Sequence, residues 1–557
     1  MKKVISLSIM LAFVLMMKAQ EKVYQPTWGS LDSRPVPSWF GNAKFGIFIH
    51  WGLYSVPAWS PKVTYAEWYK HWADKKDLFG NGDFKGDEVY EYHKKMYGEK
   101  SYADFAAMFK ALDYNPVQWA ELFEKAGAKY VVLTTKHHDG YALWPSKEAS
   151  RDFGRPWNSM DIGPGRDLVG EFTEAVRGKG LRVGLYYSMI EWDSPLCMRG
   201  RMDCYVKEHL FPQCKELVTN YKPDLLWSDG NGGYSEDTYK IKDFLAWLYS
   251  TTDVKDKVVV NDRWAKGMKH VHGDFFTSEY STSDLDVEKP WEECRGIGFS
   301  FGLNRNEDIE DYSSPKGLVL TLTNIVARGG NLLLGIAPDA NGKIPPVMQE
   351  RLLQMGKWLA VNGEAIYDTH KWRESFQWSA GAREGLKKGK YYVSGDAILA
   401  QTVCPKKGQA VKEAFFTQSA KGDVYAILPV LKSGKFVLKN IQSTNNTRIS
   451  MLGLNKTLLW KQKGKNIEVT IPVIEYGEAP CDYAWDAQAG ECEIICSYEK
   501  SDRLIDHCSD KVKNPRYIRY AWQPFTRANL VNGAGLPAST FIASRGQRYE
   551  YQLCFLI

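Results

Sequence analysis

The sequence predicts an α/β protein: a (β/α)8-like barrel, then a C-terminal β-sandwich and a small cysteine-rich tail. Short apolar runs alternate with helix-length amphipathic segments from about residue 40 to 340. Short alternating strands bounded by turns follow after about residue 365, and five of the ten cysteines lie after residue 480. At 557 residues the chain is longer than one hydrophobic core usually fills, so more than one domain is expected.

The first 19 residues have the features of an export signal. Lys2 and Lys3 form a basic start, and the apolar run 4–17 that follows is short for a membrane span. No other segment has 18 uninterrupted apolar residues. The sequence therefore predicts an exported protein, periplasmic or secreted, that does not associate with a membrane once the signal is cleaved.

Residues 20–365 are predicted to form the barrel. Six apolar runs are its predicted strands: 44–52, 129–140, 181–188, 224–230, 257–263 and 331–338. Predicted helices at 115–127, 165–180 and 314–330 each end at glycine, and the first begins with Asn115 before a proline, as helix ends commonly do. Continuous apolar strands separated by helices indicate a parallel sheet covered on both faces. Six or more such units in about 300 residues indicate a (β/α) barrel.

Polar or reactive side chains close five of these apolar runs. They are His50 with Trp51, His137 and His138 with Asp139, Tyr186 with Tyr187, Trp227 with Asp229, and Asp262 with Arg263. The C-terminal strand ends of a barrel meet at one rim, where barrel enzymes keep their sites. A single polar strand end is most simply a structural group, but five that converge are hard to explain by packing. The pattern favours a functional site at this rim.

The last two segments carry less information about function. Residues 366–479 are predicted to be a β-sandwich and residues 480–557 a cysteine-rich extension. In an exported chain these cysteines suit disulfides as well as buried thiols. Cys492, Cys496, His507 and Cys508 lack the CxxC pairing typical of zinc sites.

Asp229 raises the sharpest question, because a buried strand ends on one carboxylate and the chain then continues into glycines. Glycosidases use two carboxyl groups on either side of the scissile bond, one to attack the anomeric carbon and one to donate a proton. Asp229 would be the attacking group, with Trp227 on the same strand face. The glycines after it would keep the approach to the sugar open.

Residues 27–370 resemble the α-L-fucosidases of glycoside hydrolase family 29. The resemblance is carried by motifs in the family's order: KFGIFIHWGLYSVPAW, TYAEWY, TTKHHDGYALWPS, YYSMIEW, LWSDG, VNDRW, RGIGFSFGLNRNE and ARGGNLLLGIAP. It implies a retaining exo-α-L-fucosidase that releases terminal α-L-fucose from glycans by double displacement through a fucosyl–enzyme intermediate.

The resemblance also implies the catalytic pair. Asp229 matches the Asp of the family's W-x-D motif and would be the nucleophile. Glu279 matches the acid of members that carry T-P-E-Y, although Ser278 replaces the proline here. Glu292, in WEEC, matches the acid of a second branch of the family and is the reserve choice. The motif RGIGFSFGLNRNE is closer to the first branch, so Glu279 is preferred.

Nine residues are implied to bind the sugar. The hydroxyl-binding set is His50, Glu67, Trp68, His137, His138 and Arg263, and the set lining the ring and the C6 methyl is Tyr187, Trp227 and Phe301. A deoxy sugar needs such an apolar patch beside dense polar contacts. Adjacent histidines on a strand point to opposite faces, so a metal at His137 and His138 is not expected, and no cofactor is predicted.

Composition and the catalytic residues limit the alternatives. The net charge of +6 is spread along the chain without a Lys/Arg tract, which argues against nucleic acid as a partner. A related barrel glycosidase, for instance an α-L-galactosidase, is disfavoured by the apolar Trp227 and Phe301, although such a pocket rejects an added hydroxyl by only about a hundredfold. An inactive fucose-binding protein is disfavoured because Asp229 and a nearby acid are both present.

The end of the tail resembles another family. Residues 518–541, IRYAWQPFTRANLVNGAGLPASTF, resemble the C-terminal strand region of sialate O-acetylesterases. An esterase needs a nucleophilic serine in a sharp turn, and neither G-x-S-x-G nor a G-D-S signature occurs. The tail is therefore predicted to be a structural addition rather than a second enzyme.

Overall fold

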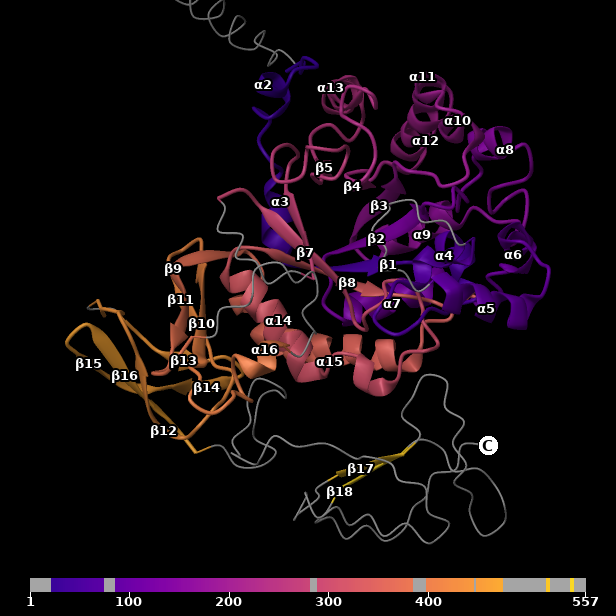
Figure 1. The fold of residues 1–557 in the computed structure, drawn as a ribbon. Helices are drawn as coiled ribbons and strands as arrows, with labels where there is room; N and C mark the ends of the chain where they lie inside the picture. The colour runs from indigo at the N-terminus through magenta and orange to yellow at the C-terminus, as the bar shows by residue number, and fades with distance from the viewer. Residues whose placement is uncertain are drawn as a thin grey trace, which may run out of the picture.

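A computed structural model describes residues 22–74, 86–280, 288–383, 397–444 and 447–473, together with strands at 517–520 and 541–544. Eight parallel strands form one curled sheet in the order β5-β4-β3-β2-β1-β8-β7-β6 (Figure 1). They are β1 (Phe45–Ile49), β2 (Tyr130–Lys136), β3 (Arg182–Ser188), β4 (Leu225–Asp229), β5 (Val259–Val260), β6 (Phe276–Glu279), β7 (Trp291–Gly296) and β8 (Asn331–Ile336). The predicted (β/α)8-like barrel is confirmed.

The two edge strands of the sheet, β5 and β6, are not paired by a regular series of backbone hydrogen bonds. The backbone N–H groups of Asp274 and Phe275 instead donate to the carbonyl of Val260, at 2.9 and 3.4 Å. Helices surround the sheet: α7 (Pro116–Lys125), α9 (Leu168–Gly178), α12 (Phe211–Tyr221), α13 (Ile241–Thr251), α14 (Pro315–Ala327) and α15 (Pro346–Asn362).

The three predicted helices begin and end as their sequences indicate. The side chain of Asn115 caps α7 by accepting from the Gln118 N–H at 3.1 Å, and Ser314 caps α14 in the same way through Gly317. Gly127 follows α7 with a φ of 84°, a left-handed conformation that glycine adopts without steric cost.

Side chains alternate between two cores along each strand. Phe48, Tyr186 and Trp227 pack inside the barrel, whereas Ile47 and Leu185 pack outward against the helices. Because both faces are covered, the strands are apolar throughout rather than alternating. This parity also decides which strand-end side chains can reach the site.

A buried ion-pair network joins the end of β2 to the helical layer. The Lys136 ammonium contacts a Glu191 carboxylate oxygen, which also lies 2.8 Å from Nε2 of His209 in the segment η4 (Val206–Leu210). Burial alone would raise the pKa of Glu191, but His209 and Lys136 outweigh it and lower the pKa to about 2. Asp152, 3.9 Å from His209 Nδ1, completes the network.

Lys136→Met is expected to destabilise the protein strongly, because it removes the lysine partner of the fully buried Glu191 carboxylate. Breaking a buried pair from one side typically costs about 3–5 kcal/mol. The midpoint of thermal unfolding should fall clearly below that of wild type, and Lys136→Met/Glu191→Gln should recover part of the loss. Lys94→Met, which removes an exposed pair with Glu99, is the control and should change little. Equal midpoints for the two single variants would refute this role of the network.

The C-terminal part has two three-stranded antiparallel sheets, as predicted for a β-sandwich. One contains β9 (Thr369–Trp378), β10 (Lys412–Ser419) and β11 (Val424–Ile427), and the other β12 (Gly434–Leu438), β15 (Leu459–Lys463) and β16 (Asn466–Ile471). Four side chains pack against the apolar clusters of both sheets: Leu428, Phe436, Leu438 and Ile441. The first sheet lies beside α14, where Lys412 Nζ donates to Asn324 Oδ1 at 2.6 Å (Figure 1).

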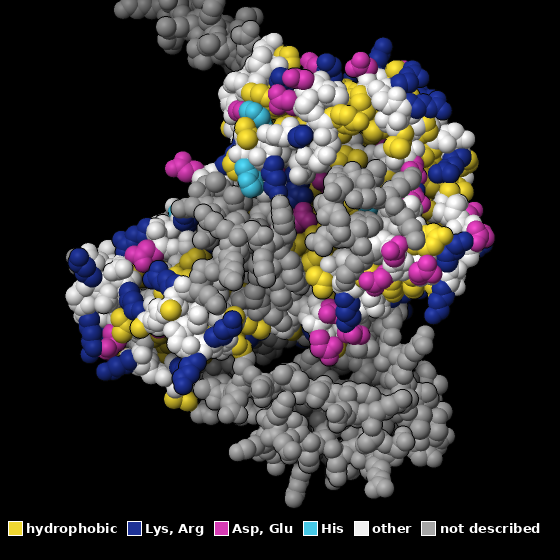
Figure 2. Space-filling view, viewed as in Figure 1, with side chains coloured by type: hydrophobic (Ala, Val, Ile, Leu, Met, Phe, Trp, Pro, Cys, Tyr) yellow, Lys and Arg dark blue, Asp and Glu magenta, His cyan; other side chains and the backbone are white. Residues whose placement is uncertain are grey.

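Several predictions fall on residues outside the described ranges. They are the signal segment 1–19 and most of the tail 480–557, in which β17 (Tyr517–Tyr520) pairs with β18 (Phe541–Ser544). Within the described ranges, no helix combines the length and apolarity that a membrane crossing requires. Figure 2 shows Lys and Arg side chains spread over barrel and sandwich and interspersed with Asp and Glu.

Candidate active site

Asp229 ends β4 with its carboxylate at the rim, where the side chain is 24% exposed. Its Oδ2 accepts a hydrogen bond from the Tyr186 hydroxyl at 3.0 Å, and His138 Nε2 lies 3.6 Å from the same oxygen. Gly230 packs tightly behind it, since an added Cβ would lie 2.6 Å from the Trp264 carbonyl oxygen. This glycine is thus required by packing, rather than by open access to the sugar as the sequence suggested.

Glu279 ends β6 and is held at both carboxylate oxygens. Arg263 Nη1 donates to Oε2 at 2.7 Å, and the Tyr65 hydroxyl donates to Oε1 at 3.0 Å. Its side chain is 28% exposed, so it also reaches the rim. Burial alone would raise the pKa of Glu279, but the Arg263 guanidinium and these hydrogen bonds outweigh it and lower the pKa below its ordinary value.

Arg263 is ion-paired with Glu279 and is also stabilised by the charge of Asp229. Its guanidinium lies 5.0 Å from the centre of the Trp227 ring. Trp227 comes two residues before Asp229 on β4, on the same face of the strand. Burial alone would lower the pKa of Arg263, but the charges of Glu279 and Asp229 raise it above its usual range. The two acids therefore face one cationic group from different strands.

Three histidines lie beside this pair. The ring centres of His137 and His138 are 4.3 Å apart, and those of His50 and His137 are 5.9 Å apart. Burial, and then the neighbouring His138, lower the pKa of His50 to about 3; the pKa values of His137 and His138 are also lowered by burial. Within the described residues, the buried Nδ1 atoms of His50 and His137 have no hydrogen-bond partner. These neutral rings can donate to or accept from a ligand's hydroxyl groups.

The prediction that His137 and His138 point to opposite faces is wrong. Both residues follow β2, which ends at Lys136, so the alternation of a strand no longer applies to them. Within the described residues, the one triad of ligand atoms close enough for a metal is Asp152, Glu191 and His209, in the network that Lys136 already joins.

Glu67 and Phe301 bring a second loop region to the site. Oε2 of Glu67 accepts from the Gly302 N–H at 2.7 Å and from the Ser300 hydroxyl at 3.1 Å, and burial raises its pKa to about 7. The Phe301 ring stacks on His50 with centres 4.9 Å apart. The Trp68 ring stands perpendicular to His138 at 5.7 Å.

Tyr187 points away from the site, contrary to the prediction that it lines the sugar. Its hydroxyl donates to Gln213 at 2.7 Å in the helical layer. The neighbouring Tyr186 is register partner to Trp227, stacks on it with ring centres 5.6 Å apart, and bonds Asp229. Because register partners on neighbouring strands point to the same face of a sheet, Tyr186, not Tyr187, shares the face of Trp227.

Glu292 lies inside the barrel below the rim. Its oxygens accept from the Tyr130 hydroxyl at 2.5 Å and from Trp227 Nε1 at 2.9 Å, and the residue is fully buried. Burial raises its pKa to about 7. A carboxyl group beneath Trp227 is poorly placed to meet a glycosidic oxygen, so the geometry favours Glu279 over this reserve choice.

Comparison with known proteins decides the family. A sequence model described as alpha-L-fucosidase matches residues 11–364, and one described as the alpha-L-fucosidase C-terminal domain matches residues 407–488. Bovine tissue alpha-L-fucosidase is 38% identical over 477 residues, which span 83% of this chain and 90% of that protein. The chain belongs to the α-L-fucosidase family.

Further relatives agree with the assignment to this family. The α-L-fucosidase of Branchiostoma floridae is 39% identical over 492 residues, covering 86% of this chain and 98% of that protein. The crystal structure of Thermotoga maritima alpha-fucosidase with a mechanism-based inhibitor is 36% identical, has a TM-score of 0.63, and covers 81% of this chain and 96% of that one. This fucosidase is accordingly a glycoside hydrolase of family 29 that releases fucose from glycans.

Two residues at the rim were not given a role by the sequence. Tyr186 was predicted to lie at the rim, but the sugar contact was assigned to Tyr187, and the register that pairs Tyr186 with Trp227 comes from the structure. Tyr65 lies in the quoted motif TYAEWY, two residues before Glu67, but nothing in its spacing indicates that it reaches Glu279, 214 residues later.

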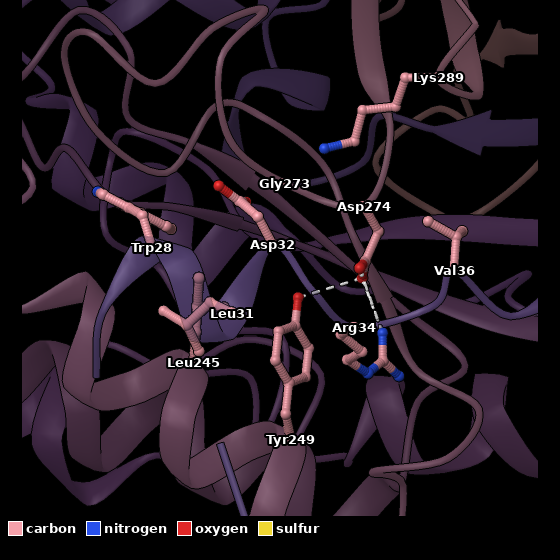
Figure 3. Close-up of a pocket in the computed structure, with 10 residues that line it drawn as sticks. All are labelled: Trp28, Leu31, Asp32, Arg34, Val36, Leu245, Tyr249, Gly273, Asp274 and Lys289. Carbon is pink, nitrogen blue, oxygen red and sulfur yellow. Dashed lines mark hydrogen bonds and ion pairs between the residues drawn. The ribbon is translucent and has the colours of Figure 1, made fainter. Parts of the chain in front are cut away.

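A separate pocket lies between α2 (Trp28–Leu31) and α13 (Figure 3). Arg34 Nη1 and the Tyr249 hydroxyl both contact Asp274 within it, at 3.2 and 3.1 Å. None of the residues described at the rim lines this pocket. These contacts hold the N-terminal segment against the barrel, away from the residues described at the rim.

Proposed function

We propose that this fucosidase is exo-acting and retaining, with Asp229 as nucleophile and Glu279 as acid/base. The observation that carries the proposal is the pair of partly exposed carboxylates at the ends of β4 and β6. Arg263 binds Glu279 and lies over the ring of Trp227, which precedes Asp229 on β4. A retaining glycosidase needs two such groups flanking the scissile bond.

In the first step, Asp229 attacks the anomeric carbon while the bond to the leaving oxygen breaks. Glu279 must carry a proton at this step, although Arg263 lowers its pKa. It gives that proton to the leaving oxygen, so the aglycone leaves as an alcohol and fucose remains as an ester on Asp229. In the second step, Glu279 takes a proton from water, the water oxygen attacks the same carbon, and the ester bond breaks. Two inversions leave the product with the configuration of the substrate.

The remaining residues suit a deoxy sugar. Neutral His50, His137 and His138, with Glu67, supply donors and acceptors for the ring hydroxyls. Tyr186, Trp227 and Phe301 form an apolar surface for the ring and the C6 methyl. A hydroxyl on C6 would find little polar compensation there, which favours a fucoside over an α-L-galactoside.

Residues 1–19 are proposed to direct export, to the periplasm or outside the cell. The basic start and short apolar run support this.

Parallel assays test the proposed substrate. Nitrophenyl α-L-fucoside, a branched Lewis-type oligosaccharide and nitrophenyl α-L-galactoside would be compared at equal concentration. We expect the aryl fucoside to be hydrolysed about a hundredfold faster than the galactoside. Cleavage of the oligosaccharide shows whether the enzyme accepts the fucose linkages of that branched glycan. Faster cleavage of the galactoside would overturn the specificity, and no cleavage of any substrate would overturn the catalytic assignment.

A further inference from the structure

The Tyr65 phenol spans from the first β/α loop region to the tip of β6. It lies just before the short helix η2 (Ala66–Trp68), and its hydroxyl reaches Glu279 Oε1 at 3.0 Å. The ring stacks on Phe299 with centres 5.3 Å apart and planes 10° from parallel, and it contacts Phe301 at 5.8 Å. Because aromatic neighbours fix the ring, the position of the hydroxyl is fixed as well.

Glu279 is thus held by two donors of different chemistry. Arg263 binds Oε2 and is itself oriented by Thr277, whose hydroxyl accepts from Arg263 Nε at 2.8 Å. A guanidinium can only donate, so it fits the ionised carboxylate and opposes the protonated one. A phenol hydroxyl both donates and accepts. Tyr65 is therefore the partner that can bond Glu279 in both of its protonation states.

We propose that Tyr65 is the positioning residue of the acid/base, holding Glu279 in one orientation through both steps of the reaction. When Glu279 is ionised and ready to take a proton from water, the Tyr65 hydroxyl donates to it. When Glu279 is protonated, the same hydroxyl can turn and accept. This inference rests on the proposed role of Glu279.

Tyr65 is not itself the proton donor. Burial, and then the charge of Glu279, raise the pKa of Tyr65 far above its ordinary value, so the phenol keeps its proton at any working pH. Its effect on catalysis must therefore pass through Glu279, and this separates it experimentally from a group that acts on the substrate.

Tyr65→Phe tests the proposal, since it removes the hydroxyl and keeps the stacked ring. General acid catalysis contributes about 10²–10⁴-fold, so loss of its alignment should lower kcat for an alkyl or oligosaccharide fucoside by about 10- to 100-fold. The first step with dinitrophenyl α-L-fucoside, which needs little proton donation, should fall less than about threefold. KM should change little because the sugar contacts remain.

The pH dependence of kcat/KM is a second test of the proposal. The Tyr65 hydrogen bond stabilises ionised Glu279 and lowers its pKa. Its removal should raise that pKa, so the limb of the kcat/KM profile that disappears in Glu279→Ala should move to higher pH in Tyr65→Phe. Tyr187→Phe is the matched control, because it deletes a buried hydroxyl that bonds Gln213 in the helical layer behind the same sheet. Neither the leaving-group dependence of kcat nor the pH profile of kcat/KM should change in this variant.

The outcomes separate the two proposals. A loss in Tyr65→Phe that is equal for all leaving groups, or no loss at all, would overturn the role of Tyr65 while leaving the fucosidase assignment intact. If the wild-type protein cleaves no α-L-fucoside, the proposed function fails and the role of Tyr65 fails with it. Thermal unfolding of each variant checks that a loss of activity does not reflect unfolding.

Discussion

Asp229→Ala is expected to abolish turnover while leaving the fold intact. No other group at the end of β4 can form the ester, because its neighbours Tyr186 and His138 contact Asp229 and cannot replace its carboxylate. Loss of a nucleophile commonly costs several powers of ten, so kcat should fall on the order of 10⁴-fold or more. Rates on nitrophenyl α-L-fucoside, with thermal unfolding of each protein, measure this.

A chemical rescue sharpens the test. Azide is small enough to occupy the space of the deleted carboxylate and attack the anomeric carbon directly, which gives a product of inverted configuration. Asp237→Asn removes a carboxylate charge from an exposed position and should keep full activity. A correctly folded Asp229→Ala protein with near-normal rates would remove Asp229 from the mechanism.

Glu279→Ala is expected to cripple hydrolysis of natural fucosides, by about 10²–10⁴-fold. An acid protonates the leaving oxygen, so activated aryl fucosides should still form the intermediate at an appreciable rate. The intermediate should then accumulate, because the same residue activates water in the second step. A burst of nitrophenol followed by slow turnover is the expected signature.

Glu292→Gln is the matched comparison for this result. The amide preserves the shape of a side chain that bonds Tyr130 and Trp227 inside the barrel. We expect no leaving-group dependence from it. If Glu292→Gln shows that dependence and Glu279→Ala does not, the acid is Glu292.

Much of the barrel could be predicted because its strands are buried on both faces. Each of the six predicted apolar runs contains a strand, β1 to β5 or β8. The missing strands β6 and β7 carry the sequences FTSE and WEECRG, which look like loops. Glu293 and Arg295 pair within β7, but Glu292 and Glu279 depend on distant partners, Tyr130 and Trp227 for Glu292 and Arg263 and Tyr65 for Glu279. Local sequence cannot reveal such partners.

The site was predictable to the extent that its residues follow strand parity. Trp227 and Asp229 share a face, as that rule predicts. The choice of Tyr186 over Tyr187 depends on the register between β3 and β4, which the sequence does not give. The rule failed for His137 and His138 because β2 ends before them. Tyr65 was out of reach, since its contact with Glu279 depends on how a loop folds over the barrel rim.

The anomer released first tests the central claim, that Asp229 and Glu279 act by double displacement, most directly. Proton NMR would follow the earliest turnover of nitrophenyl α-L-fucoside, before the free sugar equilibrates in water. The account predicts that α-L-fucose appears first and the β-anomer only later, as the free sugar equilibrates. Initial release of β-L-fucose would mean a single displacement by water, and the role of Asp229 as nucleophile would be contradicted.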